Sequence, residues 1–243
     1  MSRELTLSLA TIDILWEELG LGRAVFPFEL PRNGRTLAER AGIREAVYAD
    51  LHERGLASGG RCADSVRQPL TLLAVPNIAV TLVGLLGHNC ELRARSASDG
   101  RSAVLAVLHG QKMTIDQIHP TSVASAIVAL LPNEPAGRGQ SVTISQDDST
   151  SRNQLSLAAR SYLRRPRRHV GQFGVTVTNR AQTERRTQPL GWFDTDHGRY
   201  LCQITSERDG RNWTTYAPAT LKNITQYLDR QVQVLTDVLP DQR

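Results

Sequence analysis

The sequence predicts an α+β fold whose sheet is built from two similar ββ-β-α units. The first observation is an internal match, in which residues 92–130 align with residues 190–228 at a constant offset of 98 and without a gap. The second is the pattern within each copy, where three strand-like runs are followed by a proline and a helical pattern. Because internal repeats decide the architecture of a chain before local detail does, we expect one sheet with an approximate two-fold axis.

Length and composition favour one soluble domain. Neither half of the repeat would bury both of its faces alone, so we expect a single domain over residues 1–243, with pseudo-repeat halves of about 1–145 and 146–243. Apolar residues make up 40% of the chain, which is enough for a core, yet no run is long enough to span a bilayer. The start shows no secretory pattern, and the three cysteines include no CxxC pair. We therefore expect a cytoplasmic protein without membrane insertion, disulfide framework or zinc site.

The first part of the chain carries helical patterns, at residues 9–19, 36–55 and 65–73. Ser8 precedes the first apolar stripe as an N-cap. Thr36 and Glu39 have the spacing of a capping box, in which each side chain satisfies a backbone amide that the helix leaves free. Gly55 is placed to end the second helix in a Schellman motif, with an apolar contact between Leu51 and Leu56.

Strand patterns follow, at residues 77–86, 91–97, 102–108, 112–118, 140–145, 173–177, 190–193, 199–205 and 212–216. Asp99-Gly100 and Asp209-Gly210 are turn signals between strands. Further helices are predicted at residues 120–131 and 155–163, and a last helix is predicted with Pro218 at its first position. The apolar stripe of this last helix continues to Leu239 and makes it about 30 Å long.

The two copies differ on one face of their second strand. Leu105 and Val107 are apolar where the second copy has the polar residues Gln203 and Thr205. A central strand that is buried on both sides explains this difference, and a hydrophobic patch that receives a partner explains it as well. The sequence leaves both interpretations open.

Positive charge is concentrated in one window. The net charge of the chain is +5, and residues 160–186 contain eight arginines against the single acid Glu184. Such a run is typical of a phosphate-binding stripe or of a solvated connection. Pro166 interrupts a continuous basic helix, and no aromatic residue lies among the arginines of residues 164–168 to stack on bases. A basic nucleic-acid-binding protein using Arg160 to Arg186 is therefore the alternative function, and we consider nucleic acid an unlikely partner.

Patterns for catalysis are absent. No phosphate-binding loop, nucleophile elbow or pair of metal-ligating histidines occurs. Asp194-Thr195-Asp196-His197 is the densest polar cluster, but Asp favours turn starts and Gly198 supplies a positive φ, which indicates a hairpin turn better than a metal or acid–base site. We therefore expect no enzyme, no cofactor and no metal.

The chain resembles the EspG family, the cytosolic chaperones of actinobacterial type VII (ESX) secretion. The resemblance covers nearly the whole chain and rests on the order and spacing of several blocks: Glu39-Arg40, Arg54-Gly55-Leu56, Gly59-Gly60-Arg61, Leu73-Ala74-Val75-Pro76, Gly100 to Ala106, Leu130-Leu131-Pro132, Gly171 to Val175, Gly198-Arg199-Tyr200-Leu201 and Asp209 to Pro218. Residues 146–169 look shorter than usual for the family and are rich in arginine.

This resemblance implies a central, largely antiparallel sheet with helical bundles and quasi-two-fold symmetry. It also implies binding of the apolar tip of PPE proteins in PE–PPE heterodimers, which keeps them soluble and directs them to one secretion system. The sheet and the C-terminal helices are the expected docking surface, and the residues predicted to contact the partner are Leu105, Val107, Trp213, Thr215, Asn223, Gln226, Tyr227 and Arg230.

Two further points stay open from the sequence. Tyr227 lies outside the main apolar stripe of the last helix. This position is compatible with an ordinary amphipathic side chain and with an interface anchor. A weak homodimer of the free protein is compatible with the sequence. Binding to a PE–PPE pair should tolerate salt, whereas affinity for nucleic acid should fall steeply with salt.

Overall fold

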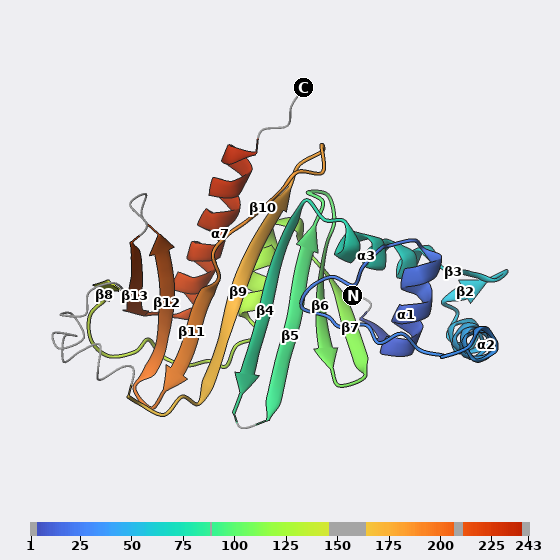
Figure 1. The fold of residues 1–243 in the computed structure, drawn as a ribbon, viewed down its shortest axis with the longest axis horizontal. Helices are drawn as coiled ribbons and strands as arrows, with labels where there is room; N and C mark the ends of the chain where they lie inside the picture. The colour runs from blue at the N-terminus through green and yellow to red at the C-terminus, as the bar shows by residue number, and fades with distance from the viewer. Residues whose placement is uncertain (1–3, 88, 146–163, 207–210, 240–243) are drawn as a thin grey trace. The chain divides into compact units, whose positions relative to one another are not determined.

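The computed structural model describes residues 4–87, 89–145, 164–206 and 211–239. The fold is mixed α+β with a large antiparallel sheet, as the sequence predicts (Figure 1). The chain divides into two compact units: unit 1 comprises Met1–Ala79 and Arg93–Ala126, and unit 2 comprises Val80–Leu92 and Ile127–Arg243. These boundaries differ from the halves 1–145 and 146–243, and a single domain stays a prediction.

Unit 1 packs helices against four antiparallel strands. Its helices are α1 (Leu9–Glu18), α2 (Leu37–Glu53) and α3 (Asp64–Ala74), and η1 (Pro120–Ser122) is a short 3-10 turn. Its strands are β1 (Leu5–Ser8), β7 (Lys112–Ile118), β6 (Ala103–His109) and most of β5 (Cys90–Ser98), in that spatial order. A small hairpin joins β2 (Ala57–Ser58) to β3 (Arg61–Cys62). The helices and strands share one apolar core, which includes Leu7, Ile12, Leu15, Leu51, Leu70, Leu73, Ala106 and Met113.

The local signals of the helices in this unit are confirmed. The Ser8 hydroxyl accepts a hydrogen bond from the Thr11 amide at 3.0 Å. At α2 both halves of the capping box between Thr36 and Glu39 are formed. At the other end the Leu56 amide donates to the Leu51 carbonyl at 2.7 Å, and the intervening glycine has a φ of +68°. This is the bond pattern of a Schellman ending.

Unit 2 has a broad antiparallel arrangement with one long helix. Its strands are most of β4 (Ile78–Leu86), then β9 (His169–Thr178), β11 (Leu190–Thr195), β12 (Gly198–Ser206), β13 (Asn212–Pro218) and β8 (Val142–Ser145), in spatial order. A short strand, β10 (Glu184–Arg186), also pairs with β9. Helix α7 (Leu221–Val238) lies across one face of these strands and packs on β9 (Figure 1). Helix α4 (Val123–Val128) begins in unit 1 and ends in unit 2.

Two predicted helix boundaries were wrong. Pro218 does not open α7, because it is the last residue of β13 and pairs with Tyr200. The helix begins at Leu221. Thr220 is its N-cap and forms a capping box with Asn223. The helix predicted over residues 120–131 is instead η1 followed by the short helix α4.

Other predictions were missed or lie outside the described residues. Strands β1 and β10 were not predicted. The helix predicted over residues 155–163 and the turn at Asp209-Gly210 fall where the structure gives no description.

The order of elements agrees between the two copies of the sequence repeat. In unit 1, strands β5, β6 and β7 are consecutive neighbours and lead to η1 and α4. In unit 2, strands β11, β12 and β13 are likewise neighbours and lead to α7. An approximate two-fold axis that relates the copies stays a prediction.

Candidate docking surface

The two predicted contact residues on β6 are buried. Leu105 is 8% exposed and Val107 is 5% exposed. They share a face of the sheet with Ser96, which pairs with Leu105 and whose hydroxyl donates to the Val123 carbonyl at 2.8 Å. The opposite face of β6 is also buried, at Val104 and at Ala106 between them. Of the two interpretations of these apolar residues, burial on both sides is confirmed, so Leu105 and Val107 form no exposed patch.

The two predicted residues on β13 lie near the edge of unit 2's sheet. Trp213 and Thr215 are two residues apart, so they lie on the same face of β13, and both are half-buried. Strand β8 follows β13 at this edge, and the hydroxyls of Thr215 and Thr143 are 2.9 Å apart. The indole nitrogen of Trp213 is buried without a hydrogen-bond partner in the described part of the chain. This face therefore offers a mixed polar and aromatic surface.

The four predicted residues on α7 have different roles. Asn223 completes the N-terminal capping box of the helix through Thr220, which is a structural task. Gln226 and Arg230 are exposed. Tyr227 is half-buried, and this burial raises the pKa of its phenol. All four side chains therefore reach the surface of the helix, with Asn223, Gln226 and Arg230 exposed and Tyr227 half-buried.

The apolar stripe of α7 is only partly covered. Ile224 and Leu228 are its only buried residues. Further along the helix Val234 is 48% exposed and Val238 is 62% exposed. Val234 follows Tyr227 by seven residues and Val238 follows Val234 by four, so the three lie on one flank of the helix. Val234 and Val238 were not among the predicted contacts, although their helical spacing from Tyr227 was the available signal.

The opposite side of unit 2's sheet forms what we term the open face. Directly paired residues of antiparallel strands point to the same side, so the registers define this face as Val142 and Ile144 on β8, Gly191 and Phe193 on β11, Tyr200, Cys202 and Ile204 on β12, and Thr214 and Tyr216 on β13. Ile204 is 42% exposed, and Val142, Ile144, Cys202 and Tyr216 are half-buried. In Figure 1 no helix among the described residues crosses this side of β9 and β11.

An aromatic cluster occupies one end of the open face, where Phe193 and Tyr200 are buried and the Tyr200 hydroxyl donates to the Arg138 carbonyl at 2.9 Å. The rings of Phe193 and Tyr200 are stacked with centroids 5.5 Å apart, and Phe193 meets Tyr216 edge-on at 6.4 Å. The guanidinium of Arg167 lies over the Phe193 ring, 5.1 Å from its centroid. Burial raises the pKa of the Cys202 thiol and of the Tyr216 phenol, and the charge of Arg167 acts in the opposite direction on both.

A buried ion pair supports this end of the sheet from the other face. Asp194 and Arg199 are paired across β11 and β12, and both are fully buried. The Arg199 guanidinium makes two bonds of 2.7 Å to the Asp194 carboxylate and a third, of 2.9 Å, to the Pro132 carbonyl. His169 approaches the same carboxylate at 3.1 Å. The turn predicted at Asp194-Thr195-Asp196-His197 is confirmed, but its first residue is a core ion, which sequence spacing did not reveal.

The arginine-rich window does not form one basic patch among the described residues. Arg165 binds Asp196, Arg168 binds Glu134, and Arg186 binds Glu184. The first two arginines lie near the start of β9, whereas Arg186 pairs with the far end of that strand at Thr176. The nucleic-acid alternative therefore finds no support in this arrangement.

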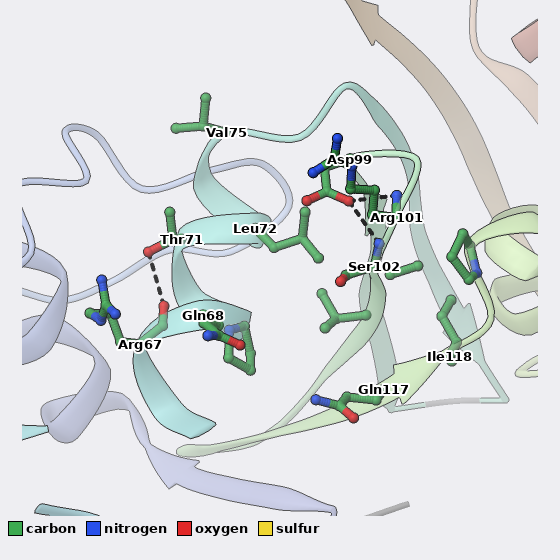
Figure 2. A pocket seen from close by; sticks show the side chains of 14 residues that line it. Arg67, Gln68, Thr71, Leu72, Val75, Asp99, Arg101, Ser102, Gln117 and Ile118 are labelled. Atoms are coloured by element: carbon green, nitrogen blue, oxygen red, sulfur yellow. Dashed lines mark hydrogen bonds between the residues drawn. The ribbon is translucent and has the colours of Figure 1, made fainter. Parts of the chain in front are cut away.

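Unit 1 contains a separate groove between α3 and the β5–β6 hairpin (Figure 2). It has a volume of about 490 Å³, and Leu72 and Val104 lie among its lining residues. Asp99 is the one acidic residue in this lining, and its carboxylate accepts from the backbone amides of Ser102 and Arg101 at 2.7 and 2.8 Å, which lowers its pKa. The groove thus shows no pair of groups set for acid–base work.

The fold and the exposed surfaces indicate a class of protein. Within residues 4–87, 89–145, 164–206 and 211–239 there is no cluster of three metal-ligating side chains. In the same residues no helix has the length and hydropathy that a membrane span requires. What the fold presents is a sheet and a helix with partly exposed apolar surface, which is the architecture of a protein-binding scaffold.

Comparison with known proteins identifies the family. The model of the EspG family matches residues 8–230, so this chain belongs to the EspG family. A solved structure, that of the Mycobacterium tuberculosis type VII secretion system chaperone EspG5 in complex with the PE25–PPE41 dimer, is similar with a TM-score of 0.67 and 16% sequence identity. The match covers 98% of this chain and 97% of that chain. A search of curated proteins gave no significant match.

Proposed function

We propose that this protein is a cytoplasmic secretion chaperone that binds the hydrophobic tip of the PPE subunit in PE–PPE heterodimers. It keeps these dimers soluble and directs them to a type VII secretion system. Family membership supports the proposal, as does the match of the whole fold to a chaperone whose structure was determined with a PE–PPE dimer. Its action is binding, without a catalytic step or a cofactor.

One observation carries the proposal furthest: the uncovered flank of α7. An 18-residue helix that buries only Ile224 and Leu228 leaves much of its apolar side in contact with water. Burying a valine side chain fully contributes about 1.5–3 kcal/mol, so covering Val234 and Val238 in a complex supplies a real part of a binding free energy. The proposed contact residues are therefore Tyr227, Val234, Val238, Gln226 and Arg230 on α7, with Trp213 and Thr215 on β13.

The predicted contacts Leu105, Val107 and Asn223 have a different place in this proposal. Leu105 and Val107 support the sheet from inside, and Asn223 holds the start of α7. Substituting any of these three is expected to lower the stability of the free protein. Loss of partner binding in such variants would follow from this destabilisation.

The test is co-expression with PE–PPE pairs encoded by the same organism, followed by size exclusion at high salt. We expect a stable 1:1:1 complex with at least one pair. Val238→Asp should weaken this complex at least tenfold because it places a charge in the apolar contact. Thr236→Asp introduces the same charge near the same helix end, where Thr236 is exposed, and should leave binding unchanged. Equal binding by both variants would contradict the proposed surface.

A further inference from the structure

Arg167 differs from its neighbours Arg165 and Arg168 in what its guanidinium contacts. Arg165 and Arg168 are neutralised by Asp196 and Glu134. Arg167 is exposed and makes no ion pair with any carboxylate in the described part of the chain; its guanidinium rests on the Phe193 ring instead. Stacking on an aromatic ring holds the planar guanidinium in place while its N–H donors remain available.

The surface beside this cation is apolar. Going outward along β12 and β13 from the Phe193 ring, the open face presents Cys202, Tyr216 and then Ile204, which is 42% exposed. Across β13 it continues to Val142 and Ile144 on β8. No acidic side chain belongs to this set of residues. A fixed positive charge at the border of an apolar face is complementary to an apolar segment that carries a carboxylate.

We propose that the open face is a second contact surface for the client, and that it receives an apolar segment of the PE–PPE dimer whose carboxylate pairs with Arg167. This inference rests on the proposed function, since it assigns the occupant to the same client. Strands β13 and β8 lie at the end of the strand order, with Trp213 and Thr215 on one side and Tyr216 and Ile144 on the other. A client that reaches around this edge contacts both faces at once.

The buried ion pair gives this surface its rigidity. The Asp194–Arg199 pair fixes the β11–β12 hairpin from the opposite face, and Arg168 donates to the Thr195 carbonyl at 2.7 Å, which ties the segment before β9 to the same hairpin. Arg167 is the neighbour of that anchor in the chain. Its position over Phe193 is therefore set before a partner arrives, and little conformational entropy is lost when a carboxylate binds.

The experiment measures the affinity of the purified PE–PPE pair for the full chain and for three variants at several salt concentrations. Arg167→Glu should weaken the complex about ten- to a hundredfold, and Arg167→Leu should weaken it less and reduce the dependence of affinity on salt. Arg164→Glu is the matched control, because Arg164 is exposed and has no ion pair among the described residues; its affinity should stay within about twofold. A thermal melt of each variant shows that the fold is retained.

The outcomes separate the two proposals. If the unmodified protein binds the pair and Arg167→Glu binds equally well, the second contact surface is wrong while the chaperone function stands. If Arg164→Glu weakens the complex as much as Arg167→Glu, the effect is general electrostatics and the inference is again wrong. If the unmodified protein binds none of the pairs, the proposed function fails, and the second surface fails with it.

Discussion

Replacing Arg199 by methionine tests how the hairpin of unit 2 is held. The substitution removes both bonds to Asp194 and the bond to the Pro132 carbonyl, and it leaves a carboxylate that is 0% exposed with His169 as its remaining side-chain partner. Breaking a buried ion pair by removing one partner costs about 3–5 kcal/mol. Because natural proteins are stable by about 5–15 kcal/mol, the free energy of unfolding should fall by a large fraction.

The assay is urea unfolding followed by tryptophan fluorescence, since Trp192 lies under the Arg199 guanidinium at 5.3 Å. In a thermal melt followed by the same fluorescence, the melting temperature should drop by about 6–20 °C, at about 2–4 °C per kcal/mol for a chain of this size. Asp194→Leu combined with Arg199→Met should recover much of this loss, because no buried charge is then unpaired. A loss below about 1 kcal/mol in Arg199→Met, or no recovery in the double variant, would refute the reasoning.

Three further predictions concern backbone packing and titration. Gly171→Ala should destabilise the protein by about 1–3 kcal/mol, because the added methyl group meets the Val83 carbonyl and lies 2.9 Å from the indole nitrogen of Trp192. Chemical denaturation measures this loss, and an unchanged stability would contradict the close packing of Gly171. Gly42 lies inside α2, and a Cβ added there meets nothing within 4 Å, so Gly42→Ala should raise the free energy of unfolding by about 0.5–1 kcal/mol in the same assay. A lower free energy of unfolding would contradict a helical Gly42 with open space around it. Burial and then the bond to Glu18 raise the pKa of Tyr48 to about 12. The folded state therefore keeps a proton that the unfolded chain loses near pH 10, so this contribution to stability is complete below pH 10 and is lost as the pH rises toward 12; Tyr48→Phe should flatten that fall, and an unchanged profile would contradict it.

Local signals carried most of the fold that could be predicted. The ends of α2 follow from Thr36, Glu39 and Gly55, because capping and left-handed glycine are determined by residues within one turn. The hairpin at Asp99-Gly100 is likewise set by its own backbone bonds to the Asp99 carboxylate. Each of these features needs no information from distant parts of the chain.

Elements that depend on distant pairing were missed or misplaced. Strand β10 has the sequence Glu-Arg-Arg, which shows no apolar alternation, and it is a strand because it pairs with β9. Pro218 suits a helix start by its fixed φ, yet pairing with Tyr200 keeps it in β13. The Asp194–Arg199 pair requires the register of β11 and β12, which two residues five positions apart do not reveal.

The candidate site likewise contains residues that the sequence could predict and residues that depend on the folded structure. The resemblance to the EspG family pointed to α7 as a docking element, and Tyr227 was noted for its position beside the apolar stripe. On this flank the structure leaves Val234 and Val238 exposed and Tyr227 half-buried. Leu105 and Val107 were selected from apolar character alone, which does not distinguish an interface from a core. Arg167 was hidden within a run of arginines, and only the Phe193 ring and the carboxylates bound by its neighbours set it apart.

The central claim is that the protein binds a PE–PPE dimer, and the most direct measurement is the mass of the species that elutes when both are co-expressed and separated at high salt. The account predicts one peak with the mass of a 1:1:1 complex for at least one pair from the same organism, and loss of that peak for Val238→Asp but not for Thr236→Asp. Separate elution of the protein and every PE–PPE pair, with the protein correctly folded, would contradict the chaperone function.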